Sequence, residues 1–165
     1  MGTALVTGAT SGIGEEFCWQ LAAAGHDLVL VARREDALRA LAASLTNVAG
    51  VNAEYIAADL STEDGCARVA ARLDVGGPAD AQKPDLRPVD LLVNNAGFGL
   101  GTDFLDNSLE NEINGLNVMV RAVMTLAHHA GISMRSRGRG AILNVGSVAS
   151  RTGAGTYSAH KAWVV

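Results

Sequence analysis

The fold is decided by the stretch Ala4-Leu5-Val6-Thr7-Gly8-Ala9-Thr10-Ser11-Gly12-Ile13-Gly14, in which a short apolar run leads into a glycine-rich turn. The run predicts a buried strand, and the residues that follow the turn have the pattern of a helix. Gly8 would permit a tight turn, Gly12 would let the backbone approach a phosphate, and Gly14 would let the helix pack closely on the strand. The amide groups at the start of such a helix suit a pyrophosphate. A turn of this kind, between a strand and a helix, predicts a dinucleotide site.

The same alternation of apolar runs and helical patterns continues along the chain. Strands are expected at residues 4–6, 28–31, 54–57, 90–93 and 141–145, and helices at about 13–24, 35–45, 62–73, 108–134 and from 157 to the end. Runs that are apolar throughout are typical of strands buried on both faces of a parallel sheet. Strands and helices in alternation predict right-handed βαβ units and a doubly wound α/β fold.

A few local signals refine these boundaries. Gly25 is expected to end the first helix, and Ser61 is expected to cap the third. The stretch from Gly76 to Pro88 contains all three prolines of the chain, and we expect it to be a surface loop rather than a domain linker. Residues 1–165 are therefore expected to form one domain.

Composition excludes several classes of function. The chain has 165 residues, 48% of them hydrophobic, and its net charge of -4 gives no electrostatic reason to expect a nucleic acid or membrane partner. Its two cysteines, Cys18 and Cys66, form no metal or disulfide pattern, and its four histidines are not expected to form a metal site. His160, next to Lys161, is expected to lie at the surface. No apolar run reaches the roughly 18 residues of a membrane span. With no targeting signal either, the expected location is the cytoplasm.

The end of the second strand indicates which dinucleotide is preferred. It reads Val31-Ala32-Arg33-Arg34 and lacks the acidic residue that would bind the ribose 2′-hydroxyl of NAD. Two guanidinium groups suit a 2′-phosphate, which favours NADP over NAD. The alternative is that Arg33 and Arg34 are only the solvated start of the next helix.

Tyr157 and Lys161 stand four residues apart, and Ser147 lies ten positions before the tyrosine. On a helix this spacing places the phenol and the ammonium on one face, where the positive charge lowers the phenol pKa from its ordinary value of about 10. Ser147, at the end of the last strand, could donate a hydrogen bond to a substrate oxygen. Taken alone, a Tyr-x-x-x-Lys pair is more often an ordinary helix face.

Together these residues resemble the short-chain dehydrogenase/reductase (SDR) family in its classical form. The motifs occur in the family's order: Thr7-Gly8-x-x-x-Gly12-Ile13-Gly14, Asn94-Asn95-Ala96-Gly97, Ser147 and Tyr157-x-x-x-Lys161. The resemblance implies a Rossmann-type sheet with strand order 3-2-1-4-5. It also implies hydride transfer between nicotinamide and a carbonyl or secondary alcohol, with Ser147, Tyr157 and Lys161 as catalytic residues.

The resemblance also assigns cofactor contacts. Tyr157 and Lys161 would contact the nicotinamide ribose, Asp59 with Leu60 would lie at the adenine, and Arg33 and Arg34 would select NADP. The pyrophosphate and the cofactor cleft would be held by Gly8, Thr10, Ser11, Gly12, Ile13, Gly14, Asn94, Ala96 and Gly97. The segment that starts at Phe98 is expected to line the substrate pocket.

Three departures from the family pattern bear on activity. The family's catalytic Asn falls on Met119 here, and Asn117 could replace it only if the helix register shifts. The connection from Ser147 to Tyr157 is about three residues shorter than is usual. The family pattern continues beyond the lysine with further strands and a substrate lid, whereas this sequence ends four residues after Lys161. The strand at 141–145 is therefore expected to be an exposed apolar edge.

Three functional hypotheses follow. The chain is an NADP-dependent oxidoreductase that acts on a small carbonyl or alcohol, or a nucleotide-binding pseudoenzyme, or an inactive fragment of a longer dehydrogenase. The motifs favour the first for ancestry, whereas Met119 favours the other two for this polypeptide. A homo-oligomer is possible in each case, and the sequence does not name the substrate.

Overall fold

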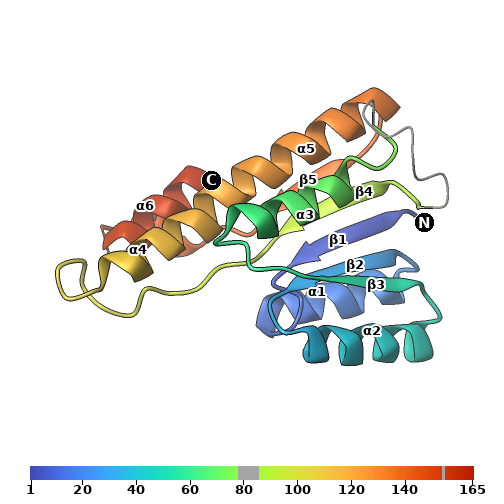
Figure 1. The fold of residues 1–165 in the computed structure, drawn as a ribbon, viewed down its shortest axis with the longest axis horizontal. Coiled ribbons are helices and arrows are strands. Elements are labelled where there is room, and N and C mark those ends of the chain that lie inside the picture. Colours follow the sequence, from blue (N-terminus) through green and yellow to red (C-terminus); the bar gives the residue numbers. More distant parts are fainter. Residues whose placement is uncertain (78–85, 154) are drawn as a thin grey trace.

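A parallel sheet with the strand order β3-β2-β1-β4-β5 forms the centre of the molecule (Figure 1). The computed structural model describes residues 1–77, 86–153 and 155–165. The strands are β1 (Thr3–Thr7), β2 (Asp27–Ala32), β3 (Ala53–Ala57), β4 (Val89–Asn94) and β5 (Ala141–Asn144). All neighbouring pairs are parallel. The expected Rossmann-type fold and its strand order are confirmed.

Helices cover both faces of this sheet, as Figure 1 shows. The helices are α1 (Gly12–Ala23), α2 (Glu35–Ala49), α3 (Glu63–Leu73), α4 (Leu109–Leu116), α5 (Ala122–Arg137) and α6 (Gly155–Val164). A π-helical turn, η1 (Asn117–Arg121), joins α4 to α5, and a 3₁₀ turn, η2 (Val148–Arg151), precedes α6. Helices α1 and α2 pack on one face, and α3 and α5 pack on the other.

The apolar runs form central strands because both of their faces are buried. In β1, Leu5 joins the core beneath α3 and α5, whereas its neighbours Ala4 and Val6 join the core beneath α1 and α2. Successive side chains of a strand point to opposite faces, so each layer of helices receives its own set of apolar residues. The sheet is thereby fixed between two cores, and its carboxyl edge is left for a site.

Some boundaries differ from expectation. Gly25, at φ +83°, ends α1 as expected. Ser61 does not cap α3: the cap is Thr62, whose Oγ1 accepts a hydrogen bond from the amide of Gly65. Ser61 instead hydrogen-bonds the carboxylate of Asp59. Most of the expected loop from Gly76 to Pro88 lies outside the described residues.

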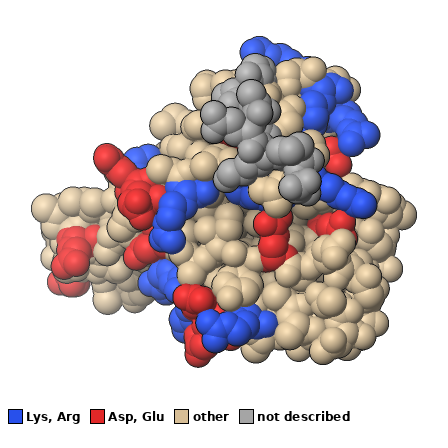
Figure 2. Space-filling model, turned by 45° about the vertical axis from the view of Figure 1, so that its right-hand side comes forward, with Lys and Arg blue, Asp and Glu red and all other residues tan. Residues whose placement is uncertain are grey.

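The surface agrees with the modest net charge. Acidic and basic side chains lie close to one another on the face drawn in Figure 2, and ion pairs such as Arg39–Glu35 and Arg68–Asp64 join neighbouring turns of helices. Within the described ranges, no helix combines the length and the apolar character needed to cross a membrane. At the sheet edge, Ile142 and Leu143 of β5 are each 38% exposed.

Candidate cofactor and catalytic site

The glycine turn between β1 and α1 forms a cradle. A Cβ built on Gly14 would lie 2.1 Å from the carbonyl oxygen of Gly8, so only glycine allows α1 to pack this closely on the strand. Gly12 has φ +53°, and a Cβ built on it would meet no atom within 4 Å. Ser11, the N-cap of α1, makes no side-chain hydrogen bond to the helix amides. The space and the amides suit an anionic group at this helix end.

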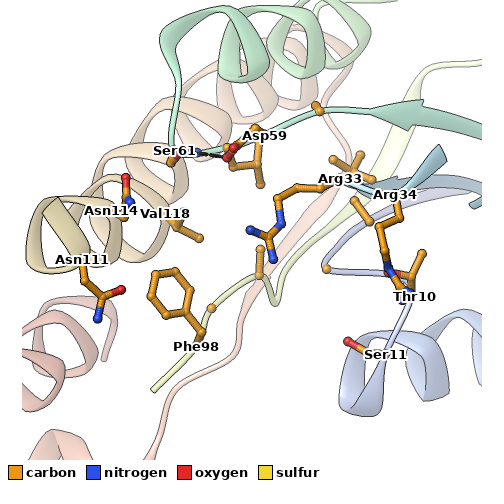
Figure 3. Close-up of a pocket in the computed structure, with 17 residues that line it drawn as sticks. Thr10, Ser11, Arg33, Arg34, Asp59, Ser61, Phe98, Asn111, Asn114 and Val118 are labelled. Atoms are coloured by element: carbon orange, nitrogen blue, oxygen red, sulfur yellow. Dashed lines mark hydrogen bonds between the residues drawn. The ribbon is translucent and has the colours of Figure 1, made fainter. Parts of the chain in front are cut away.

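A cavity of about 840 Å³ opens beside this cradle, along the carboxyl ends of the strands (Figure 3). The site residues expected from the sequence that line it are Gly8, Thr10, Ser11, Arg33, Arg34, Asp59, Leu60, Ala96 and Gly97. The other expected cofactor residues are not among those that line it: Gly12, Ile13, Gly14, Asn94, Tyr157 and Lys161. Ligands of doubly wound sheets bind at this edge, where the connections leave in opposite directions.

The hydroxyl group of Thr7 joins the strand ends next to the cavity. Thr7 Oγ1 donates to the carbonyl of Val93 at 3.3 Å and accepts from the amides of Asn95 and Ala96 at 3.0 Å each. The Asn95 side chain returns a hydrogen bond to the carbonyl of Thr7, also at 3.0 Å. Next to this pair, Asn94 Nδ2 donates to Asn144 Oδ1 at 3.0 Å. These bonds join β1, β4 and β5 where the strands end.

Charged groups are placed on one wall. The Arg33 side chain extends into the cavity from the end of β2, with Arg34 beside it (Figure 3). Across from them, the amide and hydroxyl of Ser61 donate to Asp59 Oδ1 at 2.9 and 2.8 Å. The backbone hydrogen bond from Ser61 is the main cause that lowers the pKa of the Asp59 carboxyl, and Arg33 adds to it. Asp59 is therefore a carboxylate acceptor held at a fixed place.

The opposite wall was not predicted from the sequence. Asn111, Asn114 and Val118 line the cavity from α4 and η1. Their spacing of three and four residues places them on one helix face, and this spacing was the available signal. Phe98, which was expected to line the pocket, also faces the cavity (Figure 3).

Of the three expected catalytic residues, Ser147 lies between β5 and η2, and Tyr157 and Lys161 lie on α6. Lys161 is buried, and its Nζ donates to the carbonyl of Val145 at 2.9 Å. Burial lowers the pKa of this ammonium group. Tyr157 is half-buried one turn earlier on α6. Ser147 Oγ accepts a hydrogen bond from the amide of Ala149 at 3.2 Å, and no hydrogen bond of the described residues joins Ser147 to Tyr157.

A family model described as short chain dehydrogenase matches residues 2–165. The chain belongs to this family. The very-long-chain 3-oxoacyl-CoA reductase of Laccaria bicolor is 36% identical over 98% of this chain and 46% of that protein. A putative ketoacyl reductase of the monensin polyketide synthase, from Streptomyces virginiae, is 39% identical over 98% of this chain and 60% of that protein.

Solved structures agree with this assignment. A short-chain dehydrogenase from Sphingobium yanoikuyae in complex with NADPH has a TM-score of 0.90 and 36% identity, over 99% of this chain and 61% of that one. A metagenomic short-chain oxidoreductase in complex with NADP has a TM-score of 0.83 and 30% identity. This chain spans roughly half of the first curated relative and three fifths of the first solved structure.

Met119 and Lys161 both lie close to Gly97. Met119 is 1% exposed, and a Cβ built on Gly97 would lie 3.4 Å from its Sδ and 3.6 Å from Lys161 Nζ. The helix register changes locally here, because Asn117–Arg121 form the π-turn η1. Even so, Met119 is the residue that packs beside Gly97, and the environment of Lys161 on this side is apolar.

His160 is buried, which corrects the expectation of a surface histidine. It is 7% exposed and lies against Gly115 of α4, where a Cβ would come within 3.4 Å of its Cε1. Burial lowers the pKa of His160, and the nearby carboxylate of Glu112 opposes that shift. The periodicity of α6 alone could not reveal that α4 covers this face.

Proposed function

We propose that this short-chain dehydrogenase transfers hydride between NADPH and a small carbonyl compound or secondary alcohol. The observation that carries the proposal is the cavity at the carboxyl edge of the sheet, with the glycine cradle at one end and Arg33 extended into it. Gly12 leaves open space where a pyrophosphate would lie. The nicotinamide cofactor, when bound, supplies the hydride.

The chain's own residues would manage the proton. Reduction of a carbonyl places a proton on the substrate oxygen, and Tyr157 is its proposed donor. Lys161 would favour the phenolate by its positive charge. Its bond to the Val145 carbonyl keeps the ammonium group in place. Ser147 would donate to the same substrate oxygen and fix its direction.

The test of this proposal is reduction of a panel of carbonyl compounds, followed as loss of NADPH absorbance. Tyr157→Phe keeps the ring but removes the proton donor, so we expect turnover to fall by at least about 100-fold, with NADPH affinity retained. Equal turnover in the two proteins would remove Tyr157 from the mechanism. Saturable NADPH binding without turnover of any compound would instead support a nucleotide-binding pseudoenzyme, which the apolar setting of Met119 favours.

A preference for NADPH over NADH is part of the proposal. Arg33 and Arg34 are exposed at the cavity wall, where a guanidinium group can pair with a ribose 2′-phosphate. Two structural relatives carry NADPH or NADP in their complexes. Arg33→Asp combined with Arg34→Ala should weaken NADPH about 10-fold or more and NADH little, in fluorescence titrations. Equal losses for both would show that the arginines are only a solvated surface.

Self-association is proposed through the outer face of α4. Leu109, Ile113 and Leu116 are 72%, 46% and 47% exposed and follow one another at helical spacing. An exposed apolar stripe of this kind is typical of a helix that packs against a partner. Leu116→Lys should then shift the sedimentation coefficient toward that of the monomer.

The expected location of the protein in the cytoplasm stays a prediction.

A further inference from the structure

We infer that Glu112 of α4 is a positioning residue that holds the start of α6, and therefore Tyr157, through the hydroxyl of Thr156. The inference rests on the proposed function, because Tyr157 is the proton donor proposed there. It concerns contacts between two helices that none of the motifs includes.

Glu112 is a buried carboxylate with both oxygens engaged. Its side chain is 7% exposed. Asn107 Nδ2 donates to Oε1 at 2.6 Å, and Thr156 Oγ1 donates to Oε2. A buried carboxylate that accepts from two donors is held in one orientation, because loss of either donor leaves a charged oxygen without a partner.

Capping of α4 does not explain this carboxylate. Ser108 caps the helix, since its Oγ accepts from the amide of Asn111 at 3.1 Å. The residue three positions after this cap, where a capping box needs Glu or Gln, is Asn111. Glu112 is one position later, and its carboxylate reaches α6 instead.

A continuous path of hydrogen bonds joins this contact to the cavity wall. Asn107 Oδ1 accepts from Asn111 Nδ2 at 3.0 Å. Asn111 lines the cavity, and the same Nδ2 group lies 3.4 Å from the carbonyl oxygen of Leu100. The order is therefore cavity wall, Asn107, Glu112, Thr156 and then Tyr157. A displacement of the carboxylate would move the tyrosine relative to the wall that α4 forms.

Helix α6 needs such a contact. It has 10 residues, a length that is marginal for an isolated helix. Lys161 fixes its later half by the bond to Val145. Near its start, Thr156 bonds Glu112, and Ser158 shares a 3.0 Å hydrogen bond with Thr152 of the adjoining loop. Thr156 is thus the residue that joins the start of α6 to a different helix.

The experiment compares four variants with the parent chain. Thr156→Val keeps the shape but removes the donor, Thr156→Ser keeps the donor, and Glu112→Gln removes the charge. Glu110→Gln is the matched control, because Glu110 is an exposed carboxylate on the same helix. Amide hydrogen exchange of α6 is measured by mass spectrometry, and kcat and the NADPH KM are measured by reduction of a carbonyl substrate.

We expect Thr156→Val and Glu112→Gln to accelerate exchange in α6 and to lower kcat about 10-fold or more, with the NADPH KM within about twofold of the parent value. Thr156→Ser and Glu110→Gln should match the parent. A variant in which KM and kcat change together, or in which Ser fails to restore what Val removes, would overturn the positioning role.

The two proposals fail separately. If the parent chain reduces no carbonyl compound, the proposed function fails, whereas hydrogen exchange still decides whether Glu112 anchors α6. Exchange rates in α6 that are equal in the parent, Thr156→Val and Glu112→Gln overturn the anchoring itself, whatever the activity. If Glu112→Gln does not fold, Thr156→Val and Thr156→Ser provide the comparison.

Discussion

At the scale of single residues, Lys161 is a site residue whose buried charge lowers the free energy of unfolding. Its ammonium group is buried, and burial lowers its pKa. The unfolded chain holds this proton more readily than the folded chain does. Burial of the charge therefore opposes folding below the folded pKa, and the opposition fades as pH rises from that value toward the ordinary lysine pKa of about 10.4.

Lys161→Met should remove this cost together with the proposed catalysis. The gain in the free energy of unfolding over the parent should be largest at pH 7 and shrink as pH rises toward 10, since the parent lysine loses its charge over that range. Urea unfolding at several pH values measures the difference. A gain that stays constant or grows with pH would contradict the assigned cost of burial.

Single residues were predicted well where the signal was local. Gly8 and Gly14 follow from a turn whose backbone must pass close to a helix, and both lie where that packing occurs. The burial of His160 could not be predicted, because the side chain is covered by α4, which is distant in the sequence. The cap of α3 is Thr62 rather than the expected Ser61, since serine and threonine are both favoured at this position and tertiary contacts decide between them.

At the scale of elements, the turn η1 determines what faces Lys161. Met119 sits in this π-helical turn, buried beside Gly97. The family resemblance predicts Asn at this position, and an amide could hold a water molecule near the lysine. Met119→Asn should therefore raise kcat. It should also cost about 1–3 kcal/mol of stability, because a polar group replaces an apolar one in a buried place.

Met124→Asn is the matched control for this change. Met124 is on the next helix, α5, and is 53% exposed, so an amide there should change neither rate nor stability appreciably. Steady-state kinetics and thermal unfolding of the two variants make the comparison. A Met119→Asn protein that loses stability without a gain in kcat would show that an amide at this position does not assist the lysine.

The strands were predicted more accurately than the helices. Each apolar run became a strand within one or two residues of its expected ends, because burial on both faces leaves little freedom in composition. The single helix expected at 108–134 is instead α4, η1 and α5, which end at Arg137. A π-turn depends on packing against neighbouring helices, and hydrophobic periodicity does not report it.

At the scale of the whole molecule, β5 forms an edge of the sheet. Its partner is β4 on one side only, and Ile142 and Leu143 are partly exposed. An unpaired apolar edge promotes association between chains, and a charged residue there prevents it. Ile142→Lys should therefore lower light scattering at high protein concentration. Val48→Lys, at a 76% exposed position on α2, is the control and should leave scattering unchanged.

The overall architecture could be predicted because βαβ units connect in one hand and the family resemblance supplied the strand order. How the cavity is enclosed could not be predicted from the sequence. One wall follows from the ends of β1, β2 and β3, whereas the other is provided by α4, whose approach depends on how the loop after β4 folds back. Motifs describe the strand ends, and the second wall has none.

The hydroxyl of Thr7 has a consequence for protein engineering. Its single hydrogen and two acceptor sites are all in use, so serine is the natural replacement and valine would leave two amides without partners. Those amides belong to a loop that follows Thr7 by 88 and 89 positions in the sequence. A designer who transplants the Asn95–Ala96 loop into another scaffold must transplant this threonine with it, and a library that varies either one alone will mostly sample broken pairs.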